Sequence, residues 1–153
     1  MGKLENLIPP PVVAALVAAL MWWLSGLPPA WPWPAGERTA LVLALVALGL
    51  AFDLSGLLVF LRQRTTINPL RPHRASSLAT AGVYRITRNP MYVGLCCLLL
   101  AWAVHLWSPW ALAGPLLFVA YITRFQIVPE ERALEALFGE QYRAYRARVR
   151  RWL

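Results

Sequence analysis

Charged residues are scarce in this sequence. Only 14% of the 153 residues are charged and 59% are hydrophobic, whereas a soluble domain usually carries about 25% charged residues. The shortage is greatest for acids, since seven acidic residues stand against 15 basic ones and leave a net charge of +8. The apolar residues are also clustered in long runs. This composition excludes an ordinary soluble domain and leaves no room for one beside several membrane spans.

Cysteine is almost absent as well. The two cysteines, Cys96 and Cys97, are adjacent within one apolar run. A metal site would need further Cys or His ligands at suitable spacing, and the sequence offers none. We interpret both cysteines as small apolar residues and expect no metal.

Two sequence signals are missing too. No Gly-x-Gly-x-x-Gly occurs, which argues against a Rossmann-type cofactor site. The first apolar run ends in Trp22, Trp23 and Leu27 without the small residues of a signal-peptide cleavage site. We therefore expect this run to be retained as a span, with residues 9–11, all proline, in its first turn.

Four long apolar runs predict membrane-spanning helices. They cover about 7–27, 39–61, 91–107 and 109–128, and a bilayer core of about 30 Å needs about 20 apolar residues of helix. The last two runs are separated by Ser108 alone, which predicts a tight helical hairpin. The expected fold is a single all-α integral membrane domain over residues 1–153, with about four transmembrane helices.

Arginine is distributed unevenly between the loops. The loop at 62–90 holds six Arg and no acid, the tail at 129–153 holds another six, and the segment between the first two runs offers only Arg38. The positive-inside rule therefore predicts that this loop, the tail and both termini are cytoplasmic. The Ala-, Arg- and Leu-rich composition indicates a GC-rich bacterial source, so we expect the protein in a bacterial inner membrane. Anionic lipid headgroups, rather than nucleic acid, are the expected partners of these charges.

Few polar residues fall within the apolar runs. Asp53 is the one acid inside a predicted span, and an ionisable residue there is a functional candidate by default. The alternative is that it pairs with polar groups on a neighbouring helix. We interpret His105 as interfacial and leave the role of the loop residue His73 open.

The tail predicts an amphipathic cytoplasmic helix. Pro129 is followed by Glu130 and Glu131, whose carboxylates would complement the dipole of a new helix. Further on, Tyr142, Tyr145, Val149 and Trp152 recur at offsets of three and four, as expected for one helical face. Such a helix either lies along the membrane surface or covers a pocket, and the sequence leaves both open.

Several short motifs follow one another from Gly82 onward. They are Gly82-Val83-Tyr84, Arg88-Asn89-Pro90-Met91-Tyr92-Val93-Gly94, Glu130-Glu131-Arg132-Ala133-Leu134, Phe138-Gly139 and Tyr142-Arg143-Ala144-Tyr145. In this order and spacing the sequence resembles the isoprenylcysteine carboxyl methyltransferase and phospholipid methyltransferase superfamily. The resemblance covers roughly residues 65–153. Asn89 departs from the histidine that is usual at its position.

The resemblance implies a specific chemistry. The family transfers a methyl group from S-adenosylmethionine to a lipophilic acceptor at the cytoplasmic membrane face. Matched residue by residue, the cofactor contacts fall on Ser76, Ser77, Leu78, Ala79, Tyr84, Asn89, Pro90, Met91, Tyr92 and Glu130. The family's arginine that faces a substrate carboxylate aligns with Gln126, and nearby Arg124 is the candidate to supply the missing charge.

The residues agree with this chemistry in outline. A sulfonium is cationic, so a carboxylate such as Glu130 and aromatic faces such as Tyr84 or Tyr92 suit it. Asn89 is the expected N-cap of the helix that Pro90 begins, and backbone N–H groups there could bind the cofactor's carboxylate. Methyl transfer itself depends mainly on alignment of the reactants.

Other functions remain open. The resemblance implies a methyltransferase and offers a carboxyl group as one acceptor. The alternatives are a phospholipid or small-molecule N- or S-methyltransferase, an NADPH-dependent membrane reductase, and a non-catalytic membrane adaptor. The replacement of the family's arginine by Gln126 argues against a prenylcysteine carboxylate as the acceptor.

The arginine distribution generates a topology prediction. A cysteine introduced at position 35 should react with a membrane-impermeant reagent added outside intact cells, and one at position 75 should be protected. Labelling at 75 but not at 35 contradicts the orientation.

Overall fold

The computed structural model describes residue 5 and residues 7–28, 35–63 and 78–153. Five α-helices make up most of these ranges: α1 (Pro10–Ser25), α2 (Ala35–Gln63), α3 (Pro90–Leu106), α4 (Ala113–Ile122) and α5 (Val128–Arg148). Shorter turns are the 3-10 helices η2 (Gly82–Arg85) and η3 (Pro109–Leu112) and the π-helical η4 (Thr123–Ile127). Within the described ranges the one β feature is an isolated parallel bridge between Thr87 and Arg150. The all-α prediction is confirmed.

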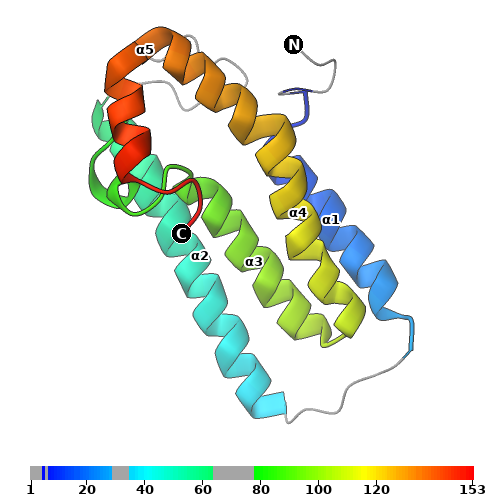
Figure 1. Ribbon diagram of the computed structural model, residues 1–153. Helices are drawn as coiled ribbons and strands as arrows, with labels where there is room; N and C mark the ends of the chain where they lie inside the picture. Colours follow the sequence, from blue (N-terminus) through cyan, green and yellow to red (C-terminus); the bar gives the residue numbers. More distant parts are fainter. Residues whose placement is uncertain (1–4, 6, 29–34, 64–77) are drawn as a thin grey trace.

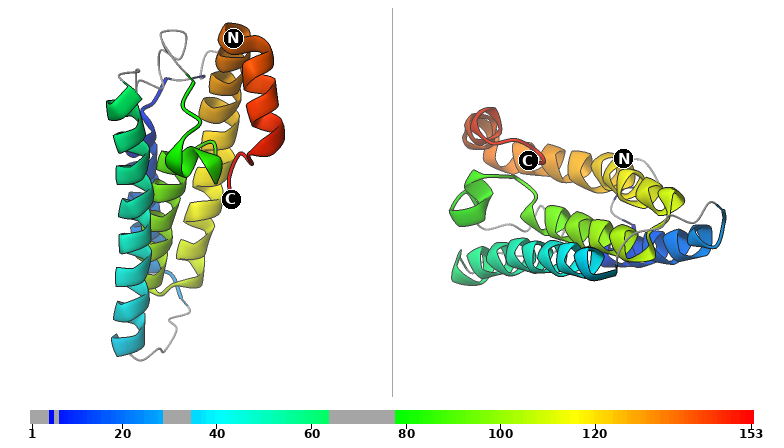
Figure 2. Two further views of the ribbon diagram at one scale, coloured as in Figure 1. Left: turned by 90° about the vertical axis from the view of Figure 1, so that its left-hand side faces the viewer. Right: turned by 90° about the horizontal axis from the view of Figure 1, so that it is seen from below.

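The helices form an elongated bundle (Figure 1). In both views of Figure 2, α3 lies between α2 and α4, and α1 contacts both α3 and α4. The buried core lies where α1, α3 and α4 meet, and its largest members include Met21, Phe118 and Ile122. From α4 the chain continues into α5, which extends past the end of the bundle and then turns back (Figure 1).

Two helical stretches are long and apolar enough to cross a membrane. They are Gly36–Val59, with mean hydropathy 2.3, and Pro109–Arg148, with mean hydropathy 1.5. Only 11% of the apolar part of the first is buried within the protein. Contact with lipid explains why so apolar a helix is left uncovered. The apolar part of the second ends before Pro129, because charged residues follow it.

The other two predicted spans form shorter helices. α1 has 16 residues and α3 has 17, somewhat fewer than the roughly 20 that a straight span needs. Both carry large apolar side chains, and Trp22 and Trp23 of α1 are exposed. The architecture is therefore that of a membrane protein, and the number of four spans stays a prediction.

Proline begins these helices as predicted. Pro10 stands in the first turn of α1 and Pro90 in the first turn of α3, where the missing N–H leaves no helical hydrogen bond unmade. Asn89 occupies the N-cap position of α3, but its side chain makes no capping hydrogen bond. Its amide instead donates to the Arg151 carbonyl at 2.8 Å, so the capping prediction is right in position and wrong in contact.

A tight turn joins α3 to the following helix. Only Trp107 and Ser108 separate α3 from η3, which confirms the predicted hairpin. Trp107 ends α3 in the left-handed conformation, with φ 47° and ψ 48°. This conformation is uncommon for a bulky residue, and it reverses the chain within two residues.

The tail helix differs from the predicted one. α5 follows α4 through η4 without a break and bends at Gly139, whose φ of 48° and ψ of −121° are not helical. Beyond the bend, Tyr142 and Tyr145 are buried as expected, but the helix ends at Arg148 and Val149 is extended. Val149 and Trp152 therefore do not share a helical face with the tyrosines. Gly139 breaks the helix because a positive φ is easiest for glycine.

α2 and α3 approach each other closely where small residues meet. A Cβ added at Gly94 would lie 2.8 Å from the Gly49 carbonyl oxygen and 2.5 Å from the Asp53 carboxyl carbon. Small residues at such crossings let membrane helices pack backbone to backbone. Gly94 thus makes room for Asp53, which lies against α3.

This close approach generates a stability prediction. Gly94→Ala should lower the unfolding free energy in detergent by about 1–3 kcal/mol, the usual cost of an overpacked contact, because neither the Gly49 backbone nor Asp53 can retreat freely. Thermal unfolding in detergent measures it. The matched control is Gly36→Ala, since a Cβ at Gly36 meets nothing within 4 Å. Equal melting temperatures for the two variants would contradict the proposed packing.

Candidate functional site

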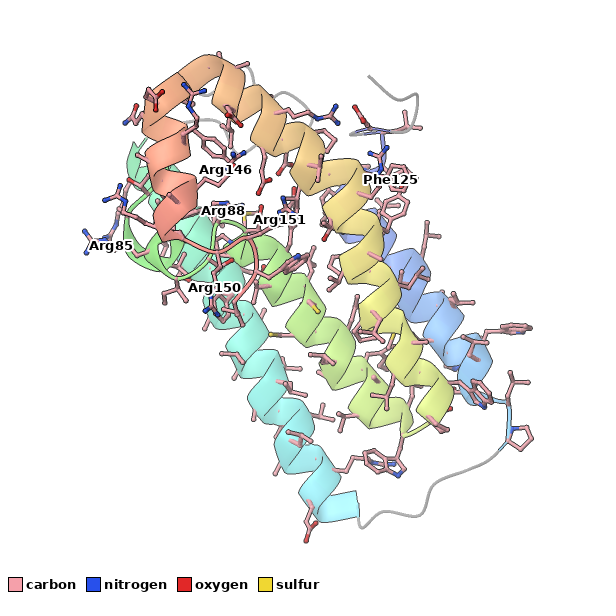
Figure 3. The ribbon with its side chains drawn as sticks, in the orientation of Figure 1. Arg85, Arg88, Phe125, Arg146, Arg150 and Arg151 are labelled. Atoms are coloured by element: carbon pink, nitrogen blue, oxygen red, sulfur yellow. The ribbon has the colours of Figure 1, made fainter. Side chains whose placement is uncertain are left out.

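Three chain segments converge on one side of the bundle. They are residues 78–90 before α3, the first turn of α5, and residues 149–153 after α5. In Figure 3, Arg88 from the first segment and Arg151 from the last lie close together between α5 and the start of α3. Six of the residues that the resemblance assigns to the cofactor belong to these segments: Leu78, Ala79, Tyr84, Asn89, Pro90 and Glu130.

Glu131 joins the three segments through ion pairs. Its carboxylate accepts a hydrogen bond from Arg88 at 2.5 Å and two from Arg151, at 3.1 Å and 2.7 Å. The side chains of Arg88 and Glu131 are only 9% and 10% exposed, so solvent screens this contact weakly. Burial alone would raise the pKa of Glu131, but the hydrogen bonds and charges of Arg151 and Arg88 outweigh it and lower that pKa.

Backbone and side-chain hydrogen bonds attach the C-terminal segment to the loop before α3. The Arg88 amide donates to the Arg150 carbonyl at 2.9 Å, and Thr87 Oγ1 and Asn89 Nδ2 both donate to the Arg151 carbonyl. Arg88 Nη1 donates to the Val149 carbonyl at 2.6 Å. The start of α3 and the end of the chain therefore form one unit, although more than 60 residues separate them.

Glu130 has a different environment from its neighbour. Its carboxyl accepts a hydrogen bond from the Tyr92 hydroxyl at 2.6 Å, and it has no ion pair in the part of the chain that the structure describes. Burial raises the pKa of Glu130 to about 8; the Tyr92 hydrogen bond lowers it and the negative charge of Glu131 raises it further. A carboxyl of this kind suits a cationic ligand, which would stabilise the ionised form.

Tyr84 lies near this carboxyl. It is buried in η2, and its carbonyl accepts a hydrogen bond from the Tyr145 hydroxyl at 2.7 Å. Burial raises the pKa of Tyr84, and the charges of Tyr145 and Glu130 raise it further. The structure thus brings together Tyr84, Tyr92 and Glu130, three of the residues that the resemblance assigns to the cofactor.

The other assigned residues are placed differently. Leu78 and Ala79 are partly buried in the loop before η2, whereas Ser76 and Ser77 lie outside the described residues, as does His73. Pro90 and Met91 pack against Gly56 of α2. Their side chains therefore support the start of α3, and any cofactor contact from them would come from the backbone.

Gln126 and Arg124 lie on different sides of η4. Gln126 is 1% exposed, and its Nε2 donates to the Ile8 carbonyl at 2.6 Å. The Arg124 side chain is 62% exposed and lies 3.6 Å from the Glu5 carboxylate. The Arg124 guanidinium carbon also lies over the Phe125 ring, 5.4 Å from the ring centre. Of these two acceptor-site candidates, only Gln126 points into the protein.

Sequence reasoning missed the ion-pair partners. Glu131 was expected to complement a helix dipole, and neither Thr87, Arg88 nor Arg151 was assigned a role. Arg88 belongs to the motif that begins α3, so the sequence did indicate that this residue has a role. Arg151 carried no such signal, because its pairing depends on how Gly139 turns the chain back.

Comparison with known proteins identifies a family. Residues 38–141 match the phospholipid methyltransferase family. An uncharacterised protein of Haemophilus influenzae is 46% identical over 63 residues, which cover 41% of this chain and 100% of that protein. Methanethiol S-methyltransferase 1 of Bradyrhizobium diazoefficiens is 40% identical over 70 residues, 44% of this chain but only 22% of that enzyme.

No solved structure matches this chain at a significant level. The family match nevertheless covers about two thirds of the residues, including most of α2, all of α3 and α4, and both Tyr84 and Glu130. The chain therefore belongs to the phospholipid methyltransferase family.

Proposed function

We propose that this protein is an S-adenosylmethionine-dependent methyltransferase that acts on a lipophilic acceptor at the cytoplasmic face of a bacterial inner membrane. Family membership supports methyl transfer. The identity of the methyl donor and the side of the membrane rest on the residues of this chain.

One observation supports S-adenosylmethionine as the methyl donor. Glu130 is a partly buried carboxyl with a tyrosine hydroxyl as its partner and no cation paired to it among the described residues. Placing a carboxylate in such surroundings costs free energy unless a positive ligand compensates it. The sulfonium of S-adenosylmethionine is such a ligand, and the aromatic faces of Tyr84 and Tyr92 favour a cation as well.

In this proposal the residues of the chain bind the cofactor and align it with the methyl acceptor. When bound, S-adenosylmethionine supplies an electrophilic methyl group. Glu130 and Tyr92 would hold the sulfonium of the cofactor in place, and Tyr84 would cover it from η2. The ion pairs of Glu131 fix α5 and the C-terminal segment around them. Since alignment of two reactants can supply much of the rate of such a displacement, this rigidity is itself a catalytic contribution.

The position of these residues suits a substrate that stays in the bilayer. Glu130 begins the charged part of α5, directly after the apolar stretch that ends before Pro129. A lipophilic tail could remain among the apolar helices while its reactive group reaches the cofactor. The arginine-rich segments at this end match the negative cytoplasmic leaflet.

The names of the relatives indicate the chemical class of the methyl acceptor but not its identity. The family is named for phospholipids, and the Bradyrhizobium relative is named for methanethiol. Neither name describes a carboxylate acceptor. This agrees with Gln126, an uncharged side chain at the buried face of η4.

Glu130 provides the test of the cofactor. We expect S-adenosylmethionine to bind in the micromolar range, roughly −8 kcal/mol, and Glu130→Gln to weaken it by about 1–3 kcal/mol, the loss typical of a charge-assisted contact. Calorimetry measures binding, and radiolabelled methyl transfer into membrane lipid and protein extracts measures activity. Glu140→Gln is the matched control, because Glu140 is exposed on α5. Wild-type affinity in Glu130→Gln would remove this residue from the site.

The raised pKa of Glu130 predicts a pH dependence. With a pKa of about 8, the carboxyl is mostly protonated at pH 6.5, so a cation must displace a proton to bind. Affinity for S-adenosylmethionine should therefore rise with pH by up to about tenfold per unit and level off above pH 8.

S-adenosylhomocysteine is the control ligand for this pH series. It has the same amino-acid group, whose amine titrates near pH 8, but no positive sulfur. The ratio of the two affinities should rise with pH in the wild type and stay flat in Glu130→Gln. A flat ratio in the wild type would show that Glu130 does not face the sulfonium.

A further inference from the structure

Five arginines gather at the end of the bundle where α5 turns back. Figure 3 shows them, and they are Arg85, Arg88, Arg146, Arg150 and Arg151. Glu131 pairs with two of them and Glu135 with a third. Arg85 and Arg150 have no ion pair. All seven acidic residues of the sequence lie within the ranges that the structure describes, so no acidic side chain of this sequence compensates these two charges.

The two unpaired arginines belong to neighbouring segments of the backbone. Both side chains are exposed, with Arg85 at the end of η2 and Arg150 two residues after α5. Thr87 forms the parallel bridge with Arg150, and the Arg88 amide donates to the Arg150 carbonyl at 2.9 Å. Each free guanidinium is a fork of N–H donors that suits the oxygens of a phosphate.

These segments lie beside the end of a membrane-spanning stretch. The apolar part of α2 ends at Val59, and a Cβ added at Gly82 in η2 would lie 3.2 Å from the Val59 side chain. One turn earlier in α2, a Cβ added at Gly56 would lie 3.3 Å from Pro90 at the start of α3. An apolar helix that crosses a bilayer ends near the lipid headgroups, so η2 lies at their level.

An exposed apolar side chain stands next to these charges. Ile86 follows Arg85 directly and is 60% exposed. Large apolar side chains beside cations are typical of surfaces that dock on anionic membranes, because the apolar group enters the acyl layer while the cations contact the headgroups. We refer to Arg85, Ile86 and Arg150 as the docking edge.

The docking edge is linked directly to the candidate site. Arg150 stands between Val149, whose carbonyl binds Arg88, and Arg151, which pairs with Glu131. A third positive charge at Arg150 repels the two arginines that attach this segment, and charges at a partly buried site are weakly screened. An anion on the docking edge would remove this repulsion and contact both segments at once.

We propose that the docking edge binds the phosphodiester headgroups of anionic phospholipids, and that this binding holds residues 149–151 against the loop before α3. The lipid acts here as an effector and not as the methyl acceptor. Because the same segments position Tyr84 and Glu130, anionic lipid should also raise the affinity for S-adenosylmethionine. This last consequence rests on the proposed function, whereas the docking edge does not.

Nanodiscs of defined composition test the docking edge with the full chain. Discs of phosphatidylcholine alone are compared with discs in which about one third of the lipid is the anionic phosphatidylglycerol, which carries no amine or carboxyl group. We expect phosphatidylglycerol to raise the melting temperature by about 4–8 °C, the shift that two arginines at an anionic surface predict for a chain of this size. Calorimetry should show about 5- to 10-fold tighter binding of S-adenosylmethionine.

Variants of the edge separate its charge from its packing. Replacing both Arg85 and Arg150 by Gln should remove most of the lipid-dependent shift in melting temperature, and replacing both by Lys should keep most of it. Ile86→Ser should reduce the shift less. The matched control replaces Arg132 and Arg143 by Gln, because these exposed arginines of α5 are already paired with acids, and it should retain the shift.

Three outcomes overturn the inference: the two lipid mixtures give equal melting temperatures, the double Gln variant of the edge keeps the wild-type shift, or the control loses as much of it. A shift of the same size on adding inorganic phosphate or a short DNA oligonucleotide to phosphatidylcholine discs also overturns it, because the edge would then serve a soluble anion. If the lipid-dependent shift is present but S-adenosylmethionine binds in neither mixture, the docking edge stands and the proposed methyl donor is wrong.

Discussion

The pairing of Glu131 with Arg88 and Arg151 connects the parts of this structure that are farthest apart in sequence. It joins the first turn of α5 to the loop before α3 and to the C-terminal segment. Removing one partner of a buried ion pair is costly, about 3–5 kcal/mol, because the other charge is left without compensation. The segments that these pairs join also carry Tyr84 and Glu130, and the Tyr92 hydroxyl on α3 donates to Glu130 at 2.6 Å, so the ion pairs support the candidate site from directly beside it.

The packing of α2 on α3 supports the same site from the membrane side. In a bilayer no hydrophobic effect drives helices together, so close contact depends on small residues. Gly49 and Gly94 bring the two backbones together and leave space for the Asp53 carboxyl between them. The start of α3, which holds Tyr92, is thereby fixed by α2 on one side and by the C-terminal segment on the other.

Apolar runs and prolines made most of the fold predictable. The hydrophobic runs located α1 to α4, and Pro10 and Pro90 marked helix starts within a few residues, because these are local effects. Gly139 could not be predicted in this way, because a glycine in a polar helix gives no sign that its φ is positive. The helix bends there, and the predicted helical face with Val149 and Trp152 does not form. The hydrogen bond from Asn89 to the Arg151 carbonyl could not be predicted either, because it joins residues that are 62 positions apart in the sequence.

Glu130 and Glu131 show how one helical turn can separate two roles. Consecutive residues of a helix point about 100° apart, so one carboxyl reaches two arginines and the other reaches the Tyr92 hydroxyl. The pKa of Glu131 is lowered by its cations, and the pKa of Glu130 is raised by burial and by the charge beside it. Neighbouring groups with pKa values displaced in opposite directions are typical of functional sites. The charge of Glu131 is already compensated by the protein, and Glu130 is the carboxyl left for a cationic ligand to compensate.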